Sequence, residues 1–226
     1  MQTLEIAKNI HWVGVLNATL RVFDVVFQTR FGSTYNSYLI LADKPTIIDC
    51  VHEKFAQEYL EKLRSLINLK DICYIVVNHT EMDHTGALDL LLKEAQNAQI
   101  LSTKTASLFL KNILHRDVKG KVVEDGECVS LGNKQLKFIH APYWHWPDTM
   151  FTYLEEDRVL FPCDGFATHF CDERLFDDRV DDFTEDFRYY FEHIMGPYRK
   201  KILEAIEKIK GMDIRLIAPS HGPILR

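Results

Sequence analysis

The chain has 226 residues, of which 46% are hydrophobic, and its formal net charge is −6 at pH 7. This length and composition predict one domain, residues 1–226, with a substantial core. The negative charge, with no basic run longer than residues 199–201, argues against nucleic-acid binding, which needs a concentrated positive surface. No apolar stretch reaches the roughly 20 residues that span a bilayer, and the N-terminus lacks a secretory pattern, so we expect a cytoplasmic protein without membrane contact.

The first third of the chain alternates between predicted strands and one helix. Strands are expected at residues 10–15, 35–41 and 46–48, an amphipathic helix at 55–67 and a buried strand at 73–77. Residues 22–27 are unusually apolar and aromatic for a connection. We interpret them as an ordinary core strand, and the alternatives are that they line a pocket or pair with a partner chain.

The rest of the chain predicts further helices and a β-meander. A helix begins near Gly86, and a second helix, capped by Ser102 or Thr103, follows a short strand. Turn dipeptides after Val122 separate the short strands of the meander. The acidic residues 172–186 are interpreted as a solvated loop, with partner docking as the alternative. The expected elements are strands at 99–101, 136–141, 151–154, 159–161 and 215–218, and helices at 105–114, 189–194 and 198–209.

Four potential metal ligands stand within six residues, directly after the predicted strand 73–77. They are His79, Glu81, Asp83 and His84. Residues two apart on an extended turn point the same way, so His79, Glu81 and Asp83 are expected to converge on one pocket while His84 faces a neighbouring point. This arrangement suits two adjacent metal ions. The alternative is a polar loop whose histidines only form hydrogen bonds.

The same pattern, a strand end followed by a ligand-type residue, recurs at His145, Asp164 and His221. Loops beyond strand ends gather at one edge of layered α/β folds, so these residues are expected to share a site with the first cluster. Taken singly, His145 could be a packed core residue and His221 a turn residue. Asp164 ends a buried strand, where an uncompensated carboxylate costs several kcal/mol, so it should be paired or bound to metal.

The sequence also suggests a role for His169, the kind of metal ion, and the state of the other histidines and the cysteines. His169 is a group that could orient a ligand. The carboxylate-rich ligand set favours iron or manganese over zinc, and iron is the better choice. The other histidines, His11, His52, His115, His140 and His193, are interpreted as structural, and Cys50, Cys73, Cys128, Cys163 and Cys171 as free thiols because no CxxC pair occurs.

These motifs resemble the metallo-β-lactamase superfamily and, within it, the core domain of the flavodiiron proteins. The match is carried by residues 34–39, 77–88, 145–151, 176–178 and 218–224. Glu81 is the most specific feature, because the hydrolases of the superfamily carry histidine there. The resemblance implies a mixed α/β and α+β fold, an αββα sandwich with a non-haem di-iron site at its edge.

The resemblance also implies a ligand set and a cofactor. One iron would be held by His79, Glu81 and His145, the other by Asp83, His84 and His221, with Asp164 bridging. Family members differ in whether the histidine at the position of His84 reaches the metal. The implied cofactor is a pair of Fe ions, Fe²⁺ or Fe³⁺, with a bridging oxo, hydroxo or peroxo species.

Two departures from the family pattern bear on function. The family usually has a histidine-containing segment before residue 34, whereas residues 23–27 contain none, which predicts a more apolar pocket. Flavodiiron proteins continue into a flavodoxin domain that carries FMN, whereas this sequence stops at Arg226, so we expect no FMN in this chain. The GxGxxG fingerprint of nicotinamide binding is also absent.

Two ferrous ions about 3.5–4 Å apart deliver two electrons to O2, which stops at the peroxide level unless another cofactor supplies more. The leading hypothesis is accordingly an O2-binding, iron-dependent sensor, similar to the single-domain oxygen-binding di-iron proteins linked to bacterial signalling and chemotaxis. The alternative is an O2 or NO reductase that receives electrons in trans from a separate flavoprotein or rubredoxin. Glu81 disfavours a metal-dependent hydrolase. The expected partners are O2, a signalling or electron-transfer protein and a second copy of the chain in a homodimer.

Overall fold

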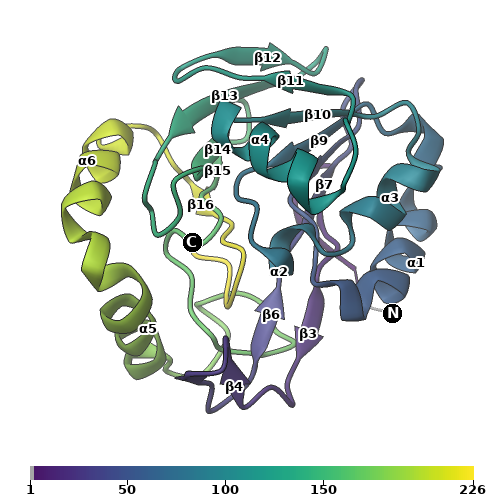
Figure 1. The fold of residues 1–226 in the computed structure, drawn as a ribbon. Helices are drawn as coiled ribbons and strands as arrows, with labels where there is room; N and C mark the ends of the chain where they lie inside the picture. Colours follow the sequence, from purple (N-terminus) through teal and green to yellow (C-terminus); the bar gives the residue numbers. More distant parts are fainter. Residues whose placement is uncertain (1–2) are drawn as a thin grey trace.

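Two β-sheets face each other and helices cover the outer face of each, which gives four layers in the order α, β, β, α (Figure 1). The computed structural model describes residues 3–226. The first sheet is mixed, with parallel pairing from β8 through β11. In spatial order its strands are β1 (Leu4–Ala7), β2 (Ile10–Trp12), β7 (Tyr38–Ile40), β8 (Thr46–Ile48), β9 (Tyr74–Val77), β10 (Gln99–Ser102) and β11 (Gly120–Val122).

The second sheet is the predicted meander, closed by a parallel strand from the C-terminal end of the chain. The meander begins later than expected, because β11 pairs with β10 in the first sheet. In spatial order the strands of the second sheet are β12 (Cys128–Ser130), β13 (Gln135–His140), β14 (Met150–Leu154), β15 (Val159–Phe161) and β16 (Leu216–Ile217).

The helices divide between the two outer faces (Figure 1). Helices α1, α3 and α4 cover the first sheet, and α5 and α6 cover the second. Thr103 is the N-cap of α4, since its hydroxyl accepts a hydrogen bond from Ala106 N (3.1 Å). The helices are α1 (Ala56–Leu66), α2 (Met82–Thr85), α3 (Leu88–Glu94), α4 (Lys104–Ile113), α5 (Thr184–Tyr190) and α6 (Arg199–Ile209), with a π-helical turn at Phe191–Met195 and 3₁₀ turns at Glu53–Phe55, Leu69–Asp71 and Gly196–Tyr198.

Three apolar cores hold the layers together. The central core lies between the sheets and includes Trp12, Phe138 and Phe161, each at most 1% exposed. One outer core joins the first sheet to α1 and α3 through residues such as Leu63, and the other joins the second sheet to α6 through residues such as Ile202. Each fully buried Leu, Ile or Phe contributes about 1.5–3 kcal/mol, so these layers fix the sheet ends that carry the polar loops.

Residues 22–27 do not form a core strand, so that prediction is wrong. Two two-residue strands, β4 (Val22–Phe23) and β5 (Phe27–Gln28), form a hairpin that stands apart from both large sheets, beside the pair β3 (Val15–Asn17) and β6 (Ser33–Tyr35) (Figure 1). Val25 is 92% exposed and Val26 67%. Phe23 and Phe27 are half-buried and turn inward, in keeping with the pocket-lining alternative.

The acidic stretch forms local ion pairs. Arg174 lies 2.6 Å from Asp172 and 3.2 Å from Asp181, and Arg30 lies 2.9 Å from Asp186. Most of the stretch is loop, and its last three residues begin α5. The five cysteines are free, as predicted. Among residues 3–226, no helix has the length and apolar character needed to cross a bilayer.

Candidate metal centre

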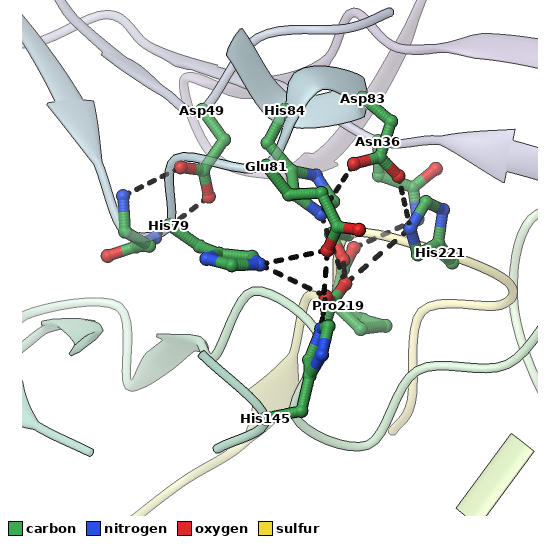
Figure 2. A network of polar contacts seen from close by, with 12 residues as sticks. Asn36, Asp49, His79, Glu81, Asp83, His84, His145, Pro219 and His221 are labelled. Atoms are coloured by element: carbon green, nitrogen blue, oxygen red, sulfur yellow. Dashed lines mark hydrogen bonds and ion pairs between the residues drawn. The ribbon is translucent and has the colours of Figure 1, made fainter. Parts of the chain in front are cut away.

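A buried carboxylate from a neighbouring strand end fixes the loop after β9 (Figure 2). Asp49 follows β8 with a φ of 52° and is 3% exposed. Its Oδ1 accepts a hydrogen bond from Asn78 N (2.7 Å), and its Oδ2 accepts one from Asn78 Nδ2 (2.9 Å). Thr152 on β14 donates its hydroxyl proton to Asn78 Oδ1 (2.6 Å). Asn78 is thereby tied to both sheets, which sets the position of His79.

The next ligand-type residues lie at the start of a short helix. Glu81 precedes α2, and Asp83 and His84 lie within it. A helix rotates successive side chains by about 100°. Asp83 therefore faces His221 instead of His79, and the prediction that His79, Glu81 and Asp83 converge on one pocket is wrong for Asp83.

Hydrogen bonds with β6 and with Asn36, the residue after β6, shape the loop after β16. Asn36 Nδ2 donates to the carbonyl oxygens of Pro219 (2.9 Å) and Gly222 (3.0 Å). His221 Nδ1 lies 2.5 Å from the Thr34 carbonyl oxygen, an acceptor. Nδ1 must therefore carry a proton, which leaves Nε2 free to face the cluster.

One group of side chains gathers around Glu81 (Figure 2). His79 Nε2 lies 3.1 Å and His145 Nε2 3.4 Å from Glu81 Oε2. His145, from the turn between β13 and β14, also lies 2.9 Å from Asp164 Oδ2, and His79 lies 3.8 Å from the same oxygen. Two imidazoles and two carboxylates therefore converge on a common point.

A second group gathers around Asp83. His221 Nε2 lies 3.0 Å from Asp83 Oδ2, and His84 Nε2 lies 3.3 Å from Asp83 Oδ1. Both histidines also approach Asp164 Oδ1, at 3.5 Å for His221 and 3.3 Å for His84. Asp164 thus turns Oδ1 towards this group and Oδ2 towards the group around Glu81, which is how a carboxylate shared by two ions is oriented.

The unsatisfied atoms of the site fit metal ions. Both Asp83 carboxylate oxygens and His84 Nε2 are buried without a hydrogen-bond partner, although buried polar atoms are normally satisfied. The ligand atoms of His79, Glu81, His84 and Asp164 lie within 4.8 Å of one another, as do those of Asp83, His84 and His221. Such a mixture of carboxylates and imidazoles suits iron better than a thiolate- or histidine-only site would.

Proton affinities in the cluster are shifted by its charge pattern. Burial would lower the pKa of His79, but hydrogen bonds to Asp148 and Glu81 raise it to about 9. Burial likewise opposes protonation of His84, and the Asp83 and Asp164 carboxylates raise its pKa well above the ordinary value. Burial would raise the pKa of Asp164, but His84 and His145 hold it well below its usual range. Protons thus supply positive charge to the metal-free cluster.

The seven residues that the sequence predicts as ligands come together, and Asp148 joins them as a partner that the pattern does not single out. Its Oδ2 accepts hydrogen bonds from Thr80 N (2.9 Å) and Thr80 Oγ1 (2.7 Å), and its Oδ1 lies 3.3 Å from His79 Nδ1. Asp148 stands 69 residues from His79 in the sequence. One sequence signal could have pointed to Asp148: it directly follows Trp146 and Pro147, in a segment that carries the family resemblance.

His169 lies beside His221 and forms its hydrogen bond with Ser33. The two rings are 5.0 Å apart, and His169 Nδ1 is 2.8 Å from Ser33 Oγ, which itself lies 3.4 Å from His221 Nδ1. Burial lowers the pKa of His169 to about 3. A neutral ring here is compatible with the predicted role of orienting a ligand, and that role stays a prediction.

Two cavities reach the cluster, with volumes of about 260 and 390 Å³. Phe27 and Trp146 line the smaller one, as expected for an apolar pocket. Asp24 adds a carboxyl group to both cavities, which the sequence prediction of a more apolar pocket does not include. Partial burial of this group and the neighbouring Glu81 carboxylate raise the pKa of Asp24 to about 6.

The fold and the site define a metallo-β-lactamase-like protein with a two-part cluster of histidines and carboxylates. Residues 34–222 match the family described as ODP family beta lactamase, and the chain belongs to that family. The fold predicted from the sequence and the resemblance to flavodiiron proteins are therefore confirmed.

Known proteins similar to the chain carry flavodiiron names. The flavo-diiron protein FprA2 of Clostridium acetobutylicum is 39% identical over 230 residues, which cover 100% of this chain and 58% of that protein. The structure of the flavodiiron protein from Giardia intestinalis has a TM-score of 0.96 and 34% identity, and covers 100% of this chain and 56% of that one. Rubredoxin oxygen:oxidoreductase from Desulfovibrio gigas has a TM-score of 0.96 and 32% identity, with 100% and 57% covered. The chain thus spans little more than half the length of these relatives.

Proposed function

We propose that the chain holds two iron ions and binds O2 between them. His79, Glu81 and His145 would hold one ion, Asp83, His84 and His221 the other. The observation that carries this proposal is the orientation of Asp164, whose two oxygens face the two groups separately. The names of the flavodiiron relatives support iron as the metal.

Two ferrous ions in this site would supply two electrons to a bound O2 molecule. The protein contributes the cavity in which O2 would bind. The smaller cavity offers about 260 Å³, ample for a diatomic gas, and Phe23, Phe27 and Trp146 form the apolar part of its lining. Each of these side chains occupies a place where water or a proton donor would otherwise stand.

Oxygen sensing is the use that we propose first for this site. A site that delivers two electrons and is not resupplied rests in its oxidised form, so its oxidation state reports exposure to O2. A signalling partner and a homodimer belong to this proposal. The second candidate is reduction of O2 or NO with electrons from a separate flavoprotein or rubredoxin. It is favoured by the similarity to rubredoxin oxygen:oxidoreductase.

Oxygen consumption by the anaerobically reduced, iron-loaded protein separates the two uses. An electrode trace with NADH alone, and then with a rubredoxin and its reductase added, gives the number of turnovers. The sensing proposal expects about one O2 per site in both cases. Sustained consumption with the electron carriers present would reject sensing as the main use and support the reductase.

A further inference from the structure

Asp24 lines both of the cavities that reach the cluster. Four residues line both cavities, and Asp24 and Glu81 are the two that carry charge; the other two are Phe23 and Trp146. The smaller cavity continues to Asp164 and His221, and the larger one to Asp83. The Asp24 carboxyl group therefore borders both cavities through which a ligand could reach the cluster.

The hairpin holds Asp24 at this point in an uncommon backbone conformation. Phe23 pairs with Phe27, so Asp24, Val25 and Val26 form a three-residue loop. Asp24 has a φ of 46° and Val25 a φ of 69°. Positive φ is rare for a β-branched residue such as valine, and strained backbone clusters at functional sites. The loop leaves Val25 92% exposed, and Asp24 is itself solvent-exposed while it lines both cavities.

In the described part of the chain, the carboxyl groups along these routes have no lysine or arginine beside them, and the basic side chains that line the cavities are histidines. No Lys or Arg within residues 3–226 lines either cavity, whereas Glu81, Asp83, Asp164 and Asp24 contribute carboxyl groups. The first three belong to the proposed ligand set. Asp24 adds a fourth carboxylate, so the site would balance the four positive charges of two ferrous ions.

We propose that Asp24 is a specificity-determining residue that repels anionic ligands from the metal site and admits neutral diatomic gases. The inference rests on the proposed function, because it needs metal ions at the cluster. A carboxylate repels an approaching anion, and repulsion between unit charges a few Å apart is large where the effective dielectric constant is about 20. A neutral molecule such as O2 or NO meets no such barrier.

Azide and NO serve as the charged and neutral probes. Iron-loaded, oxidised protein is titrated with sodium azide at about pH 8, where carboxyl groups are ionised, and the visible absorbance gives the Kd. Asp24→Asn is expected to bind azide at least ~10-fold more tightly than the wild type. NO binding by the reduced protein, followed by EPR, is expected to stay within about twofold.

Two further variants serve as controls, one for the charge at position 24 and one for the net charge of the protein. Asp24→Glu keeps the charge and is expected to bind azide nearly as weakly as the wild type. Asp117→Asn removes one carboxylate that is 85% exposed and lines neither cavity, so it controls for net charge and should leave azide binding unchanged. Asparagine tolerates positive φ well, so Asp24→Asn is compatible with the hairpin.

The outcomes separate this inference from the proposed function. Iron content is measured first, and a wild type that binds fewer than two ions would overturn the proposed function. If the wild type binds two ions, an azide affinity that is equal in wild type and Asp24→Asn overturns the inference alone. Iron loss from Asp24→Asn also overturns it, since Asp24 would then act in metal retention. Tighter azide binding in both Asp24→Asn and Asp117→Asn would assign the effect to net charge.

Discussion

The Asp148 carboxylate lies 3.3 Å from His79 Nδ1, and neither side chain is exposed to solvent. Burial would raise the pKa of Asp148, but its contacts with His79 and Thr80 keep it lowered, so the group is an ionised acceptor. His79 must therefore hold a proton on Nδ1. Its Nε2 is left to face Glu81 and the proposed metal ion.

Replacing Asp148 with asparagine is expected to lower iron affinity by ~10–100-fold, the usual effect of removing a carboxylate that orients a histidine ligand. The asparagine amide can donate to Nδ1 and favour the wrong tautomer. Competition with a chelator measures the affinity. Asp213→Asn, which changes a carboxylate that is 73% exposed, is the control and should behave as the wild type. Equal retention by Asp148→Asn and wild type would refute the role.

The sequence could predict the layers and most of the site because both depend on local patterns. Apolar strands that end in a ligand-type residue point to His79, His145, Asp164 and His221, and the structure brings these side chains together. The role of Asp148 could not be predicted, since it depends on a contact between two distant loops.

Other features lie outside what periodicity can determine. Asp83 is separated from His79 by a single helical turn, whose presence in a short polar loop is not evident from spacing. An apolar run has the same pattern whether it fills a core or lines a cavity. The apolar residues of the hairpin around Asp24 therefore have the pattern of a core strand although they line a cavity.

Removing the shared carboxylate should damage the centre more than removing one histidine. Asp164→Ala is expected to lose both iron ions, because Asp164 faces His145 on one side and His84 on the other. His84→Ala should retain more iron, since the other ligands of each group remain. Elemental analysis after identical reconstitution gives the occupancies. Full occupancy in Asp164→Ala would rule out the bridging position.

The metal-free protein should become less stable as pH rises from about 6.5 to about 9. The folded-state pKa of His79, about 9, lies above the unfolded value of 6.5, so its contribution is complete below pH 6.5 and is lost through pH 9. The loss from His79 alone is about 3 kcal/mol. Denaturant unfolding in the presence of a chelator measures it, and stability that rises across this interval would contradict the assignment.

Iron retention should change with pH in the opposite sense. Metal binding needs neutral imidazoles, so protons compete with iron. Because the pKa of His79 is raised to about 9, competition should begin well above the unperturbed value of 6.5. Iron release measured against a fixed free chelator concentration should increase steadily as pH falls from about 9. A plateau that extends down to pH 6 would show that His79 does not bind the ion.

A proton donor in the cavity wall should shorten the life of the visible absorbance that follows O2 addition. Phe27 lines the smaller cavity together with His145 and Asp164, so Phe27→His introduces an imidazole near the site. Phe31→His is the matched control, because Phe31 is 48% exposed and does not line the cavity. Stopped-flow spectra give the decay rates. Equal decay rates in both variants would show that the residue at position 27 does not control the lifetime of the absorbing species.

The most direct test of the central claim is the iron content and magnetic coupling of the wild-type chain. Protein reconstituted with ferrous iron without oxygen, then oxidised, is analysed for metal and examined by Mössbauer and EPR spectroscopy. The arrangement of Glu81, Asp83 and Asp164 predicts two iron ions per chain, coupled into an EPR-silent oxidised pair. One iron per chain, two uncoupled ions, or a site that retains zinc alone would contradict the di-iron assignment.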